Sequence, residues 1–144
     1  MINRLAYFII ITLYVCCKTE DDGLPDCSAV SCVTPFILID LVDNTTKDNI
    51  ILQDNISNTA IVILDASENP FEFTIIKTKG LLYIEKKSAS DFLEIRIDSQ
   101  ITTSLSYNTS TPNTNECCDF GDLIDVQVNS NTFKVEDNTV TVYL

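Results

Sequence analysis

Apolar and polar residues alternate with a period of two through most of the chain. The segment 91–98, DFLEIRID, is the clearest case, because its apolar residues Leu93, Ile95 and Ile97 are separated by charged residues. The same alternation predicts three further strands with inward-facing residues, namely Phe71, Phe73 and Ile75 of PFEFTII, Ile124, Val126 and Val128 of LIDVQV, and Val140, Val142 and Leu144 of TVTVYL. No segment shows a convincing helical pattern.

Shorter apolar runs between polar turns extend this pattern. We expect strands at PFILIDLV, TAIVIL, GLLYIEK and ITTSLSY, with DNIIL a shorter candidate. The turn clusters NSN and EDN flank the short strand TFKVE, so residues 122–144 are predicted to form a three-stranded meander. Eight or nine short strands with no room for crossover helices predict an all-β fold, an antiparallel two-layer β-sandwich of the Ig-like or transthyretin-like kind.

The N-terminal segment follows a different pattern. One positive charge, Arg4, precedes an apolar run from Leu5 to Val15 that ends at Cys16 and Cys17. This run is shorter than the roughly 20 residues that span a bilayer, and its layout is that of a secretory signal peptide. The alternative is a buried first strand or helix. LYVC and YVCC both resemble the lipobox of bacterial lipoproteins, in which the cysteine receives a diacylglycerol and becomes the new N-terminus. We take Cys17 as the lipidated residue and Cys16 as the alternative.

An acidic stretch follows directly after these cysteines. KTEDD, residues 18–22, resembles the acidic export signal of surface lipoproteins from Bacteroidota-type bacteria. The whole arrangement is similar to small Bacteroidota lipoproteins, in which a lipobox and an acidic tether precede one all-β domain. The resemblance implies a lipid anchor in the outer membrane, facing the cell surface. It divides the chain into a signal peptide (1–16), a tether with the first cysteine pair (17–32) and a β-sandwich (33–144).

Charge and composition narrow the function. The chain has 9 Lys and Arg against 21 Asp and Glu, so phosphates would be repelled and we expect no nucleic-acid partner. Histidine, the commonest general base, is absent, and no catalytic motif is present, so we expect neither an enzyme nor a cofactor. Asp119, Asp122 and Asp125 offer carboxylates for acid–base chemistry, and the same acids, or Asp40 with Asp43, offer oxygen ligands for calcium. Solvated edge and turn carboxylates explain them equally simply, so we expect no metal site.

Four cysteines remain after the lipidation pair: Cys27, Cys32, Cys117 and Cys118. An even number in an exported protein indicates two disulfides. A bridge between the adjacent Cys117 and Cys118 would close a strained ring, so we expect each of them to pair with one of Cys27 and Cys32. Which pairs with which stays open. A zinc site of four thiolates is the alternative, although its usual C-x-x-C spacings are missing.

Two functional hypotheses follow. The absence of Trp and His favours a non-catalytic binding or accessory module that is held in the membrane by its lipid and binds another envelope or surface protein. The alternative is a carbohydrate-binding or carbohydrate-processing surface lipoprotein, which would use aromatic residues such as Tyr83, Tyr107 and Tyr143. If the last strand lies at a sheet edge, its outward residues Thr139, Thr141 and Tyr143 include no charge to block a partner strand. Internal pairing on both sides of that strand is the competing possibility.

Overall fold

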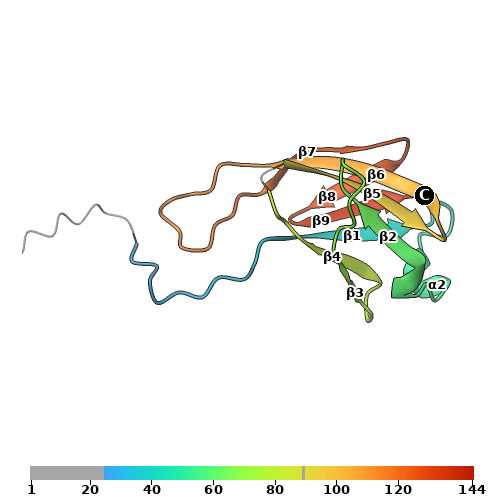
Figure 1. Cartoon of the computed structure of the whole chain (residues 1–144), viewed down its shortest axis with the longest axis horizontal. Helices are drawn as coiled ribbons and strands as arrows, with labels where there is room; N and C mark the ends of the chain where they lie inside the picture. Colours follow the sequence, from blue (N-terminus) through green and yellow to red (C-terminus); the bar gives the residue numbers. More distant parts are fainter. Residues whose placement is uncertain (1–24, 89) are drawn as a thin grey trace, which may run out of the picture.

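The computed structural model describes residues 25–88 and 90–144 as a two-layer sandwich (Figure 1). The expected signal peptide, Cys16, Cys17 and the acidic stretch lie outside the described residues. The strands in the described ranges are β1 (Phe36–Val42), β2 (Ile61–Leu64), β3 (Thr74–Ile76), β4 (Leu81–Glu85), β5 (Ser90–Ile97), β6 (Gln100–Thr109), β7 (Leu123–Val128), β8 (Thr132–Glu136) and β9 (Thr139–Tyr143). One sheet has the order β3-β4-β1-β9-β8 and the other β2-β5-β6-β7. The predicted all-β sandwich is confirmed.

The core lies between the two sheets and follows the period of two. In β5, Leu93 and Ile95 are fully buried, and in β9 so are Val140 and Val142, as predicted. Leu144 packs against this core from its margin. Burying such a side chain contributes about 1.5–3 kcal/mol relative to leaving it exposed. Local alternation therefore identified the inward faces of these strands correctly.

The C-terminal strand β9 lies inside its sheet, not at an edge. It runs parallel to β1, with Leu38 opposite Thr139 and Val42 opposite Tyr143, and antiparallel to β8 on its other side. The predicted interaction edge of Thr139, Thr141 and Tyr143 is therefore wrong. Pairing of β9 with β1 places the inward valines of β9 in the core. It also means that one strand pair of the sandwich, β1 with β9, is parallel.

The predicted meander of residues 122–144 is also wrong. β7 pairs with β6 in the four-stranded sheet, whereas β8 and β9 form a hairpin in the other sheet. The chain crosses between the layers at residues 129–131, where the Asn129 N–H donates to the Ser104 carbonyl and the Thr103 hydroxyl bonds Asn131. A polar turn cluster suits a hairpin and a crossing equally well, so the sequence does not distinguish them.

At the start of β7, a different residue faces the core from the one that the alternation predicted. Leu123 is 8% exposed and Ile124 is 40% exposed, the reverse of the prediction, while Val126 and Val128 pack against the core as expected. The cause is a β-bulge. The register with β6 shifts at this point, and Asp125 adopts a left-handed φ of 52°. One extra residue on β7 reverses the alternation on its two sides.

Two other segments differ from the predicted strands. DNIIL overlaps the short helix α2 (Ile50–Gln53), in which the Asn49 side chain accepts the Leu52 N–H at 2.9 Å and caps the helix. Ile51 still reaches the core at 3% exposure. Of PFEFTII, only Thr74–Ile76 forms a strand, although Phe71 is buried.

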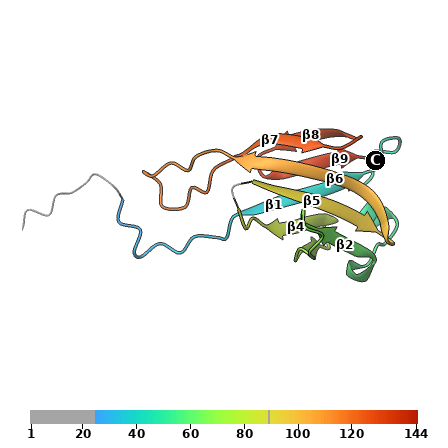
Figure 2. The ribbon, with the colours of Figure 1, turned by 45° about the horizontal axis from the view of Figure 1, so that its top comes forward.

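The loops gather at two opposite ends of the sandwich (Figures 1 and 2). One end, called the disulfide end, contains residues 25–35, 86–88 and 110–122. The other, called the α2 end, contains α2, the β5–β6 turn and Leu144. Among the described residues, none of the helices has the length and apolar character needed to cross a membrane.

Candidate functional site at the disulfide end

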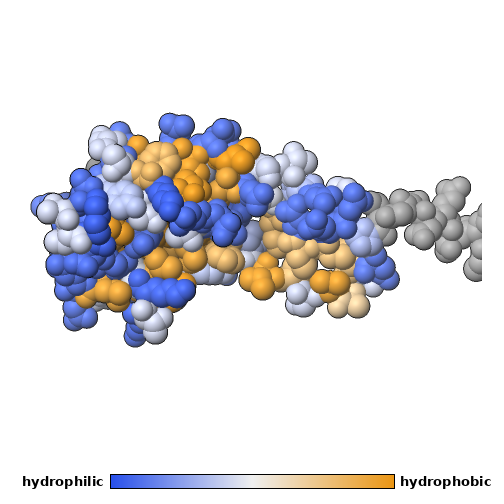
Figure 3. All heavy atoms as spheres, turned by 180° about the vertical axis from the view of Figure 1, so that it is seen from behind, coloured by the Kyte–Doolittle hydropathy of each residue, from blue (hydrophilic) through white to orange (hydrophobic). Residues whose placement is uncertain are grey.

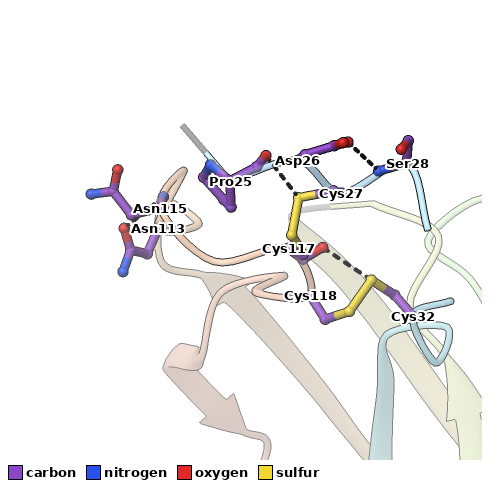
Figure 4. Close-up of a disulfide and its surroundings, with 9 residues drawn as sticks. All are labelled: Pro25, Asp26, Cys27, Ser28, Cys32, Asn113, Asn115, Cys117 and Cys118. Carbon is purple, nitrogen blue, oxygen red and sulfur yellow. Dashed lines mark hydrogen bonds between the residues drawn. A yellow bond between two sulfur atoms is a disulfide. The ribbon is translucent and has the colours of Figure 1, made fainter. Parts of the chain in front are cut away.

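Two disulfides join the segment before β1 to the loop before β7 (Figure 4). Cys27 is bonded to Cys117 and Cys32 to Cys118, with Cα–Cα distances of 5.3 Å in both bridges. The expected splitting of the vicinal pair is confirmed, and the structure assigns the partners. Because all four sulfurs form disulfides here, they are not available as thiolate ligands for zinc.

Two hydrogen bonds between Ser110 and Asp122 hold the ends of the stapled loop together. The Ser110 N–H donates to the Asp122 carbonyl and the Asp122 N–H donates to the Ser110 hydroxyl, both at 2.9 Å. Gly121, which directly precedes Asp122, has a φ of 76°. A Cβ at that position would collide with the Ser110 carbonyl oxygen. Glycine is needed at this position for both its conformation and its size.

Asp119 organises the same loop through its carboxylate. One oxygen accepts the Asn113 N–H at 2.6 Å and the other accepts the Gly121 N–H at 2.7 Å. The hydrogen bond from Asn113, followed by that from Gly121, holds the pKa of Asp119 below its usual value. This carboxylate therefore stabilises a turn.

Three of the other acids considered for calcium or catalysis also have local roles. Asp43 accepts the N–H groups of Thr45 and Thr46, and Asp40 accepts the side-chain amide of Asn49 at 2.7 Å. Asp125 lies in the bulge of β7 and bonds Asn108. Within residues 25–88 and 90–144, no group of three or more acidic or cysteine side chains is placed to hold a metal ion.

Lys86 is a buried charged residue at this end that the sequence analysis did not identify. It follows β4, is 8% exposed, and donates from Nζ to the Gly121 carbonyl at 3.3 Å. Burial lowers the pKa of Lys86, while the charges of Asp122 and Asp119 oppose that shift. The sequence does contain a pattern that indicates this burial, because Lys86 follows Leu82 and Ile84 in one inward-facing row with a period of two.

Apolar side chains are exposed around this lysine. Val33 is 71% exposed and Phe120 40% exposed, and both line a hollow of about 410 Å³ beside Lys86. A second hollow of about 470 Å³ also includes Lys86 and Phe120. Seen from behind, this part of the molecule carries apolar areas next to hydrophilic ones (Figure 3). The arrangement provides apolar contact area on loops that two disulfides crosslink.

The tyrosines considered for sugar binding have other surroundings. Tyr107 is 2% exposed, and burial raises the pKa of its hydroxyl, which has no hydrogen-bond partner in the described structure. Tyr83 stacks on Phe36 with ring centroids 5.1 Å apart. Lys47 covers the ring of Tyr143 at 4.8 Å. Tyr107 therefore offers no surface to a sugar ring, and Tyr83 and Tyr143 are each in contact with a neighbouring side chain.

Comparison with known proteins adds no functional assignment. No protein-family model, curated protein or solved structure matches this chain.

Proposed function

We propose that this protein is a non-catalytic binding or accessory module, anchored in the outer membrane by a lipid on Cys17 or, alternatively, Cys16. The disulfide end would contact another envelope or surface protein. The observation that carries this proposal is the pair of disulfides between residues 27–32 and 117–118. Disulfides form and persist in oxidising compartments, which agrees with export directed by the N-terminal segment.

The position of the disulfides relative to the proposed anchor supports a partner close to the membrane. Cys17 precedes Pro25 by eight residues. A chain of that length reaches at most about 26–29 Å when fully extended. Pro25, the first described residue of the disulfide end, would thus remain within roughly 30 Å of the lipid, which would favour contact between this end and molecules near the membrane surface.

The chemistry of the same end supports binding over catalysis. The Asp119 carboxylate is already bonded to two backbone N–H groups, and Lys86 donates to a backbone carbonyl. Exposed aromatic side chains such as Phe120 are typical of the centre of a protein-binding surface. A rigid loop also reduces the entropy lost on association.

Co-purification from detergent-solubilised outer membranes tests this proposal. The full-length chain should retain an envelope protein after washing, and the double variant Val33→Ser and Phe120→Ser should lose most of it. Val62→Ser is the matched control, because Val62 is 41% exposed but lies on β2, away from the disulfide end. Equal recovery with all three proteins would contradict the assigned surface. Specific binding to a glycan array without a protein partner would favour the carbohydrate alternative.

A further inference from the structure

The two sheets end in four outer strands, and three of these offer little to a partner strand. Beside β2, the Phe71 N–H donates to the Ile63 carbonyl at 2.7 Å, and Pro70 forms a bridge to Leu64. β3 is only three residues long. β7 is distorted by the bulge at Asp125. Short strands, bulges and covering segments are the usual means by which sheet edges avoid pairing.

The remaining edge strand, β8, has none of these protections in the described structure. It pairs with β9 over five residues without a shift in register, and it contains no proline and no residue with positive φ. It is the last strand of its sheet, so its outer side carries backbone N–H and C=O groups that no described strand meets. Phe133, on the core-facing side of β8, remains 39% exposed. An added strand would pair these groups and cover this ring.

The charges on β8 indicate which strand fits. Lys134 and Glu136 form an ion pair of 2.6 Å, with side chains 57% and 68% exposed. They lie on the outer face, opposite Thr141 and Thr139 of β9. A lone lysine on an edge strand discourages pairing, but a lysine and a glutamate two positions apart make the strand complementary to an antiparallel copy of itself.

We propose that two copies of this chain associate through antiparallel pairing of their β8 strands, joining the five-stranded sheets edge to edge. Val135 would lie opposite Val135 of the second copy. Lys134 of each chain would then face Glu136 of the other, giving two opposite-charge pairs related by twofold symmetry. Sliding one strand by two residues would place Lys134 against Lys134 of the second copy. The charges therefore favour one register.

Sedimentation velocity of the full-length chain in mild detergent tests the proposal. The wild-type protein should form a concentration-dependent dimer. Lys134→Glu should raise the dimer dissociation constant by about ten- to a hundredfold, because two attractive cross-strand pairs become repulsive. The double variant Lys134→Glu and Glu136→Lys should regain dimerisation, since it restores opposite charges in the same register.

Circular dichroism melting of each variant provides the folding control. The affected ion pair is exposed and contributes little to stability, so melting temperatures should hardly change. A wild-type protein that stays monomeric at every concentration would overturn the proposal. So would a dimer that survives Lys134→Glu unchanged, or a double variant that remains monomeric while folded. Binding to an envelope protein through Val33 and Phe120 is a separate readout, so either proposal can fail without the other.

Discussion

Cys117 and Cys118 are neighbours in the chain, yet each is bonded to a different cysteine of the segment before β1. The two bridges span 90 and 86 positions of sequence. Together they hold residues 27–32 against the loop that contains Gly121, whose carbonyl accepts a hydrogen bond from Lys86. The two bridges therefore join segments that are distant in sequence into one continuous surface.

Removing one of the two bridges should cost less stability than removing the second as well. Replacing Cys32 and Cys118 by serine should cost about 2–3 kcal/mol in the free energy of unfolding, because Cys27–Cys117 still closes the long loop. Removing both bridges should cost about 7 kcal/mol on the same chain-entropy model. Urea denaturation of the oxidised variants measures both values. Equal losses from the first and second removal would show that loop closure does not explain the stabilisation.

The N-terminus of the mature protein should be an acylated Cys17. Mass spectrometry of protein from membranes should show this mass, with Cys17→Ser abolishing lipidation and Cys16→Ser preserving it. The opposite response would assign the lipid to Cys16. An intact Met1 in the membrane-extracted protein would refute the lipoprotein interpretation altogether.

Gly121→Ala should destabilise the disulfide end. The left-handed φ of 76° and the collision with the Ser110 carbonyl should together cost about 1–3 kcal/mol. Ser130→Gly is the matched control, because Ser130 also has a positive φ, of 63°, in an exposed turn. That variant should leave stability unchanged or slightly higher. Thermal melts compare the two, and equal behaviour would show that the Ser110–Asp122 loop tolerates a side chain.

Asp119 should make part of the stability depend on pH in the acid range. Its folded-state pKa lies below the reference value of 3.8, so its contribution is fully present above that value. The contribution is lost as the pH falls through the lower folded-state pKa. Asp119→Asn should therefore flatten the decline in unfolding free energy below about pH 4, measured by urea titrations at several pH values. Asp54→Asn, at the α2 end, controls for the loss of one negative charge. An identical decline in both variants would contradict the role of Asp119.

Some features of this protein are determined by short stretches of its sequence. The alternation in residues 91–98 and 139–144 predicted strands whose inward residues are buried, because a strand places every second side chain on one face whatever its partner. The cysteine count and the strain of bridging adjacent residues predicted how Cys117 and Cys118 divide their partners. The first inference depends on the geometry of an extended backbone and the second on the covalent geometry of adjacent cysteines, and both are properties of neighbouring residues.

Other features were decided only by the tertiary structure. The pairing of β1 with β9, the transfer of the chain from β7 to β8 across the layers, and the burial of Lys86 depend on residues distant in sequence. The bulge at Asp125 reversed the expected roles of Leu123 and Ile124, although their local pattern was unchanged. Alternation determines which residues share a face of a strand. Which sheet the strand joins, and which side lies open, is determined by the packing of the whole chain, because that packing decides where every inward face and backbone group finds a partner.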